Sequence, residues 1–198
     1  MYSIVISDWE NSFNNLSYFL INNLSSEEYL TLELEGENSH FIRFNNAKVR
    51  QTGVVIDCNV KLRLVHHKKT NSAAFPLTGN QELDLKNALE NLTYLREEIE
   101  QIPEDPYVIL PENKGSSREV YEGELLPLDS AVSEILPIVQ DLDFTGYYTS
   151  GSVVRANYNS LGQKHWFSND SFFLDYSLIN SKNPKNVGAA KRLIVVII

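Results

Sequence analysis

The stretch Val54–Leu64, VVIDCNVKLRL, carries the clearest pattern in this 198-residue sequence. Apolar side chains occupy its six even-numbered positions, and polar or charged side chains occupy four of the five positions between them. Alternate residues of a β-strand point to opposite faces of the sheet, so this pattern predicts a strand with one buried and one solvated face. We expect all the even-numbered side chains to be buried, and we expect so long a strand to be curved or bulged.

Before this stretch, the sequence predicts a helix and two short strands. Asp8 is a typical N-cap residue, and apolar side chains follow it at helical spacing as far as about Leu24. Alternating side chains then predict strands over residues 30–34 and 42–44, and Gly36–Asn38 is interpreted as a turn between them.

After this stretch, strands and helices come in groups. His66-His67-Lys68-Lys69 is interpreted as the end of the long strand. The expected elements are a return strand over Ala73–Leu77, a helix over Gly79–Ile102, a loop over Asp105–Gly123, a helix from Asp129 or Ser130 that Pro137 kinks or shortens, and strands over Val153–Tyr158 and Trp166–Leu178 joined by a hairpin loop. This order predicts an α+β fold: a mainly antiparallel curved sheet packed with two to three helices.

Composition and charge narrow the classes of partner. The net charge is -9, so the field around the protein repels a phosphate backbone, and we expect no nucleic-acid partner. The longest apolar run, Leu193–Ile198, is far shorter than the roughly 20 residues of a membrane-spanning helix, so we expect no membrane partner. Cys58 is the single cysteine, which excludes an internal disulfide and fits a cytoplasmic protein.

A search for catalytic patterns gives a negative result. None of the four histidines is followed by the glutamate of a zincin helix, and neither a nucleophile elbow nor a phosphate-binding loop is present. Cys58 is expected to be buried and inert, because it lies on the apolar face of the long strand. His66 and His67 are expected to point to opposite faces of their strand and not to converge on one metal ion. We therefore predict no catalytic residue and no metal ligand.

A short segment before the long strand is the best candidate for binding. Arg43 lies on the polar side of its predicted strand and could hold a carboxylate or a peptide backbone. Arg50 and Gln51 follow after the turn at Asn45-Asn46. A surface salt bridge is the alternative explanation for each arginine.

The segment Arg43–Gly53, RFNNAKVRQTG, resembles the opening signature of the TldD/PmbA (modulator of gyrase) family. In that signature a strand with Arg-Phe leads through an Asn turn to Val-Arg-Gln and a long strand. Two later segments are also similar to the family pattern: Pro103–Pro106 after a long helix, and Ala156–Gly162 followed by Trp166 and Ser177. The resemblance covers about Tyr29 to Leu178.

The resemblance implies an N-terminal α+β domain of a zinc metallopeptidase that hydrolyses unfolded or modified peptides. The TldD branch carries an H-E-x-x-x-H zinc motif, whereas PmbA-type subunits can lack metal ligands and assemble with a metal-bearing subunit. No position here matches that motif, so we expect no cofactor, no stoichiometric zinc and no peptide cleavage by this chain alone. A family subunit or a peptide is the expected partner, with Arg43, Asn45, Arg50 and Gln51 as the binding residues. The alternative function is a non-catalytic peptide- or subunit-binding module.

The end of the chain departs from the family pattern. We interpret residues 1–178 as the family's N-terminal domain and residues 179–198 as an atypical tail left by truncation. The aliphatic run Leu193–Ile198 is expected either to dock as an added strand or to drive self-association.

Overall fold

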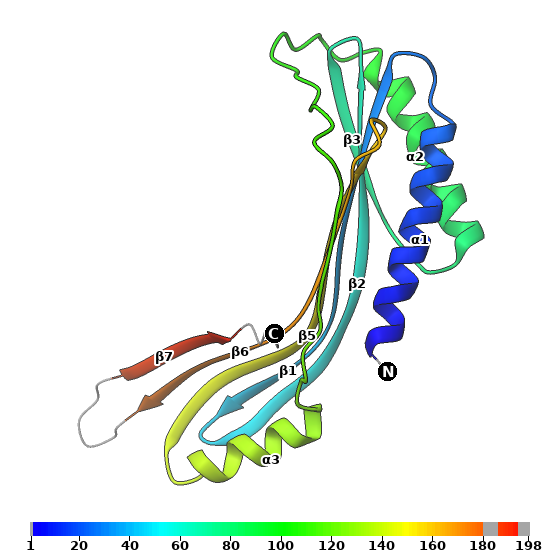
Figure 1. Ribbon diagram of the computed structural model, residues 1–198. Helices are drawn as coiled ribbons and strands as arrows, with labels where there is room; N and C mark the ends of the chain where they lie inside the picture. The colour runs from blue at the N-terminus through cyan, green and yellow to red at the C-terminus, as the bar shows by residue number, and fades with distance from the viewer. Residues whose placement is uncertain (1, 180–185, 194–198) are drawn as a thin grey trace. The chain divides into compact units, whose positions relative to one another are not determined.

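A computed structural model describes residues 2–179 and 186–193 of the chain (Figure 1). Within these residues three helices and seven strands follow one another in the order α1 (Tyr2–Asn22), β1 (Glu28–Asn45), β2 (Lys48–His66), β3 (Lys69–Pro76), α2 (Gln81–Ile99), β4 (Ser117–Tyr121), α3 (Leu128–Val139), β5 (Asp143–Asn159), β6 (Lys164–Ile179) and β7 (Asn186–Leu193). No described helix is both long enough and apolar enough to cross a membrane.

The strands form one sheet in the order β3-β2-β1-β5-β6-β4, and β7 pairs with β6 outside this path. The pairs β2–β3 and β6–β7 are antiparallel, with Leu62 opposite Ala73 and Tyr176 opposite Ala189. Short turns join β1 to β2 and β5 to β6, a connection that only antiparallel neighbours can use. The prediction of an α+β fold with a mainly antiparallel sheet and two to three helices is confirmed.

The chain divides into two compact units, and β1, β2, β5 and β6 each contribute to both. Unit 1 contains the residues up to Gly36 together with Asp57–Val120 and Val154–Ser168. Unit 2 contains Glu37–Ile56, Tyr121–Val153 and the residues from Asn169 onward.

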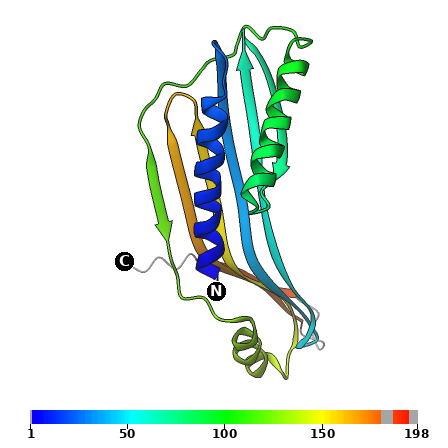
Figure 2. The same ribbon diagram turned by 90° about the vertical axis from the view of Figure 1, so that its right-hand side faces the viewer.

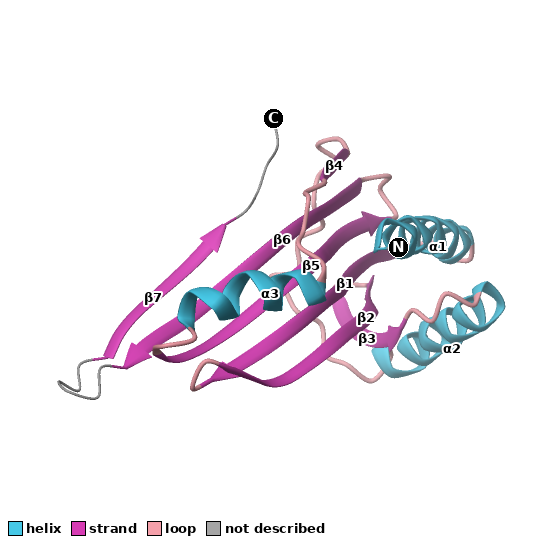
Figure 3. Ribbon diagram, turned by 90° about the horizontal axis from the view of Figure 1, so that it is seen from below, coloured by secondary structure: helices cyan, strands magenta, loops and turns pink. Residues whose placement is uncertain are grey.

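The core of unit 1 lies between the sheet and two helices. α1 and α2 cover the same face of the strands (Figures 2 and 3). α1 contributes an apolar stripe that includes Phe13, Leu16 and Leu20, because these positions recur on one side of a helix. Burying each of these large side chains contributes roughly 1.5–3 kcal/mol before entropy. α2 adds Leu92, Leu95 and Ile99 to this layer. The strands contribute Leu30, Leu32, Leu34, Cys58, Val60, Leu62, Leu64, Phe75, Val154 and Trp166.

The core of unit 2 is smaller. α3 packs through Ala131 and Val139 against Ile42, Phe44 and other side chains of β1 and β5. Phe172, Leu174, Tyr176 and Leu178 of β6 are partly buried against the same cluster. α3 is the most apolar of the helices, and Pro137 lies inside its last turn rather than ending it.

The long strand is confirmed, but the expectation that all its even-numbered side chains are buried is wrong at two positions. The even positions from Cys58 to Leu64 are buried, whereas Val54 and Ile56 are 58% and 62% exposed. Cys58–Leu64 lie under α1 and α2 in unit 1. Val54 and Ile56 belong to unit 2, where no described side chain of β2 joins the core. Alternation shows which side chains share a face of the strand, but that face is buried only where another element covers it.

The turn expected at Gly36–Asn38 does not exist, because β1 runs without interruption from Glu28 to Asn45. Gly36 is required there for another reason. A Cβ atom at this position would lie 2.9 Å from Cζ3 of Trp9, closer than packed atoms come. The glycine therefore makes room for the indole on the covered face of the strand.

Other boundaries also differ from the prediction. α1 begins at Tyr2, so Asp8 lies within the helix and does not cap it. Ile6 packs against the core of unit 1 and extends the apolar stripe upstream of Asp8. The segment expected to be a loop contains β4, whose five side chains are all exposed and which has no buried face to reveal it. α2 is capped by Asn80, whose side chain accepts a hydrogen bond from the backbone N–H of Leu83.

The tail is described only in part. Residues 186–193 form β7, an added strand on β6 that contains only the first residue of the aliphatic run. The rest of the aliphatic run, residues 194–198, lies outside the described residues.

Candidate binding surface and histidine cluster

Three of the four predicted binding residues lie together on one face of the sheet in unit 2. Nη1 of Arg43 donates a hydrogen bond to Oε1 of Gln51 over 3.4 Å. Oδ1 of Asn45 accepts a hydrogen bond from Oγ1 of Thr145, also over 3.4 Å. All three predicted residues are exposed, since they point away from the face that α3 covers.

An aromatic pair lies on the same face. The rings of Phe41 and Tyr147 stack with centroids 5.7 Å apart and an interplanar angle of 23°. A Cβ atom at Gly53 would lie 2.6 Å from Cε1 of Phe41, so the glycine gives this ring its place. We call this uncovered surface the open face of unit 2: Phe41, Arg43, Asn45, Gln51, Thr145 and Tyr147.

Arg50 is not part of the open face. It directly precedes Gln51 in β2, and successive strand residues point to opposite sides of the sheet. Arg50 is exposed on the other side. Among the described residues, no carboxylate lies within ion-pair distance of Arg43 or Arg50, so the salt-bridge explanation finds no partner there. A guanidinium without an internal carboxylate remains able to bind one from a ligand.

The structure corrects the expectation for His66 and His67. Their rings lie with centroids 3.9 Å apart rather than on opposite faces. His66 is the last residue of β2, and His67 and Lys68 form the turn to β3 with φ values of 46° and 60°. The alternation of a strand does not extend into such a turn, so the expectation that the two rings point to opposite faces is wrong.

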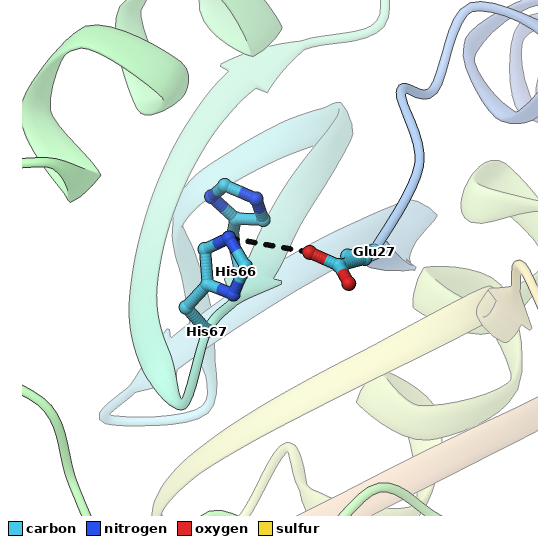
Figure 4. Close-up of side chains that lie close together, drawn as sticks. All are labelled: Glu27, His66 and His67. Carbon is cyan, nitrogen blue, oxygen red and sulfur yellow. Dashed lines mark ion pairs between the residues drawn. The ribbon is translucent and has the colours of Figure 1, made fainter.

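Glu27 lies beside the two histidines, and we call Glu27, His66 and His67 the histidine cluster. Its Oε2 atom lies 3.3 Å from Nε2 of His67 (Figure 4). One ligand atom each from Glu27, His66 and His67 lies within 4.8 Å of the other two. Glu27 could not be predicted from the sequence, because it precedes β1 and is distant in the chain from the two histidines. The signal that could have suggested the cluster was the adjacent histidine pair at a predicted turn.

Cys58 is confirmed as a buried side chain of unit 1. Burial, followed by the charges of Asp57 and Asp84, raises the pKa of its thiol to about 12. A thiol with so high a pKa is a poor nucleophile at neutral pH.

The sheet of unit 1 carries a groove of about 330 Å³ that both polar and apolar side chains line. Nε of Arg155 lies 3.5 Å from Oε1 of Glu35 at this groove. Oγ of Ser117 lies 3.0 Å from Nδ1 of His165. Arg155 is thus already paired with Glu35, and His165 already has a hydrogen-bond partner, so the groove favours no particular ligand.

Comparison with known proteins identifies the fold. No protein-family model and no curated protein sequence matches the chain. Three solved structures are similar: a proposed modulator of DNA gyrase from Thermotoga maritima (16% identity, TM-score 0.65), TldE from Thermococcus kodakarensis (11%, 0.65) and a proposed modulator of DNA gyrase from Bacteroides thetaiotaomicron (12%, 0.63). The chain has the fold found in these proteins. The resemblance predicted from sequence is thereby confirmed at the level of fold.

The alignments cover almost all of this chain but less than half of each solved protein. They include 94%, 93% and 91% of the present chain, and 43% of each of the other three. The chain therefore spans well under two thirds of the length of the proteins whose fold it shares.

Proposed function

We propose that this chain is the N-terminal part of a TldD/PmbA-type protein and that it contributes a surface for a peptide or a partner subunit. The observation that carries this proposal is the fold match over 94% of the chain to the proposed gyrase modulator from Thermotoga maritima. The Arg43–Gly53 segment supports it independently, because its residues resemble the family signature in sequence. A buried cysteine that has no disulfide partner fits a cytoplasmic location.

The open face of unit 2 supports the choice of a binding role. Arg43 offers a fork of N–H donors that matches a carboxylate. The stacked rings of Phe41 and Tyr147 offer an apolar surface beside it. Extended peptides present both kinds of group, a carboxylate and apolar side chains, at short spacing.

Hydrolysis is assigned to another part of the protein or to another subunit. The family's zinc chemistry requires the H-E-x-x-x-H ligands, and no position in this sequence supplies that motif.

The test is a binding assay with a matched pair of arginine variants. Fluorescence polarisation would measure the binding of a dye-labelled, unfolded peptide to the chain. The peptide has twelve residues, including two glutamates and a phenylalanine. Arg43→Gln should weaken binding by at least about tenfold, since a charged hydrogen bond contributes roughly 1.5–3 kcal/mol. Arg50→Gln is the control, because it removes the same charge from the other side of the sheet.

Equal losses in the two variants would show that only net charge matters and would contradict a site on the open face. The absence of saturable binding by the unaltered chain would contradict the binding role itself. Cleavage of the peptide by the chain alone would contradict the assignment of hydrolysis elsewhere.

A further inference from the structure

We propose that Glu27, His66 and His67 form a binding site for a divalent cation of the zinc class. The site lies in unit 1, where the segment before β1 meets the turn between β2 and β3 (Figure 4). It shares no residue with the open face of unit 2, and it is independent of the function proposed above. It also reverses the expectation from sequence that the chain holds no metal ligand.

The spacing of the three side chains is close to what a metal requires. Zinc binds imidazole nitrogen and carboxylate oxygen at about 2.0–2.2 Å, so two ligand atoms of a tetrahedral site lie roughly 3.3–3.6 Å apart. Nε2 of His67 and Oε2 of Glu27 are already 3.3 Å apart. The third ligand atom, from His66, lies within 4.8 Å of both. Glu27 and His67 are exposed, so rotation of their side chains can close this remaining distance.

The donor set selects the class of cation. Two imidazoles and one carboxylate suit zinc, copper, nickel and cobalt, whereas calcium and magnesium prefer sites built from oxygen alone. Three protein ligands leave at least one coordination position for water. We expect zinc to bind at this site and magnesium not to compete with it.

The segment that carries Glu27 is held in place by Arg96 of α2. The next residue, Glu28, accepts hydrogen bonds from Nε and Nη2 of Arg96, each over 2.7 Å. Nη2 of Arg96 also donates to the carbonyl oxygen of Asn23 over 2.7 Å. α2 therefore fixes the loop between α1 and β1, which limits the entropy that Glu27 loses when it binds a metal.

The turn that carries the histidines is held in a similar way. Nζ of Lys69 donates to the carbonyl oxygen of Glu100 over 2.9 Å and lies 3.8 Å from its Oε2 atom. Oε1 of Glu100 lies 3.7 Å from Nδ1 of His66. A carboxylate that accepts a hydrogen bond from a metal-bound histidine orients its ring, and a small rotation of the exposed Glu100 side chain would bring it within that distance. The same carboxylate offsets the charge of Lys69, which would otherwise oppose a cation.

Zinc bound at this site would join two segments that are far apart in the sequence. Glu27 lies before the first strand, and His66 and His67 lie where the β2–β3 hairpin turns. A ligand that binds the folded state and not the unfolded state raises the melting temperature. The site therefore predicts a thermal shift as well as a binding stoichiometry.

The test uses the full chain without a polyhistidine tag. Equilibrium dialysis against zinc sulfate at neutral pH should give one zinc per chain, and differential scanning calorimetry should show a higher melting temperature with zinc. Cobalt in place of zinc should give the visible absorption of a four-coordinate site. His67→Asn and Glu27→Gln should each weaken zinc binding at least tenfold and abolish the thermal shift. Asparagine is chosen because it tolerates the positive φ of position 67.

His165→Gln is the matched control, since it removes a histidine that lies outside the cluster. Zinc binding should be unchanged in this variant. Equal melting temperatures of all chains without metal would show that the variants are folded. Failure of the unaltered chain to bind zinc, or binding that persists in both His67→Asn and Glu27→Gln, would overturn the proposal.

Discussion

Arg96 and Glu28 form a two-pronged ion pair in which Nε and Nη2 of Arg96 donate to Oε1 and Oε2 of Glu28, each over 2.7 Å. This contact ties α2 to the first residue of β1. The side chain of Glu28 is only 6% exposed, so its charge depends on this partner. The hydrogen bonds from Arg96 lower the pKa of Glu28, although burial opposes the shift.

Removing this arginine should destabilise the protein. Arg96→Met keeps much of the apolar stem but leaves the Glu28 carboxylate without its donors, so we expect a loss of about 2 kcal/mol in the free energy of unfolding. Lys86→Met is the control, because the Lys86–Glu90 pair is solvent-exposed and contributes at most about 0.5 kcal/mol. Urea denaturation followed by circular dichroism measures both. Similar losses in the two variants would mean that burial does not strengthen the Glu28 pair.

The same pair predicts a dependence of stability on pH. The pKa of Glu28 is lower in the folded state than its usual value of 4.5, so the folded state keeps this carboxylate ionised where the unfolded state takes up a proton. The contribution of the pair is therefore complete above the usual pKa and is lost as the pH falls through the folded-state pKa. Urea midpoints measured from neutral pH down to pH 3 should converge for the unaltered chain and Glu28→Gln. A constant difference across this range would contradict the prediction.

Gly36→Ala should be destabilising through a single contact. The added methyl group would lie 2.9 Å from Cζ3 and 3.0 Å from Cε3 of Trp9, so the indole must move within a packed core. Overpacking of this kind costs typically 1–3 kcal/mol. Trp9→Leu in the same chain should relieve the clash, so the double variant should be more stable than the sum of the two single losses predicts. Additive losses, measured by thermal unfolding, would show that the Trp9 ring does not cause the effect.

Strand β2 offers a matched pair of variants, one at a buried position and one at an exposed position. Leu62→Ala removes a fully buried side chain, and we expect it to cost about 2–5 kcal/mol. Ile56→Ala removes an equally apolar side chain from the same strand, but that side chain is 62% exposed, so we expect a change within about 0.5 kcal/mol. Chemical denaturation separates the two outcomes. A large loss for Ile56→Ala would mean that this side chain is covered in solution.

These positions show how far the sequence could predict the fold. Alternation from Val54 to Leu64 identified the strand and its faces, because pleating acts on each residue locally. It could not show that the covering helices protect Cys58–Leu64 and not Ile56, because that depends on packing between distant segments. The turn expected at Gly36 is absent for the same reason: the glycine is required by its contact with the Trp9 ring, which is distant in the sequence, and not by the local backbone conformation.

The candidate sites show the same contrast between local pattern and contacts that only the fold creates. Arg43 and Gln51 were identified from a local pattern, and the structure brings them into contact. Arg50 was grouped with them, although alternation in β2 places it on the other face. Glu27 was missed because no local pattern links it to His67, and only the folded chain brings the two together.

Cys58 should resist modification in the folded protein. Burial raises the pKa of its thiol to about 12, so the reactive thiolate is scarce at pH 8 and the sulfur is shielded from solvent. A disulfide reagent such as DTNB should react slowly with the native chain and rapidly in urea, where the pKa returns towards its usual value of 9.0. Above that value the unfolded thiol loses its proton while the folded thiol keeps it, so stability should fall as the pH rises from 9 towards 12. Cys58→Ala should lack this part of the alkaline loss. Rapid, stoichiometric labelling of the native chain would contradict the burial of Cys58, and an identical alkaline loss in Cys58→Ala would assign that loss to other groups.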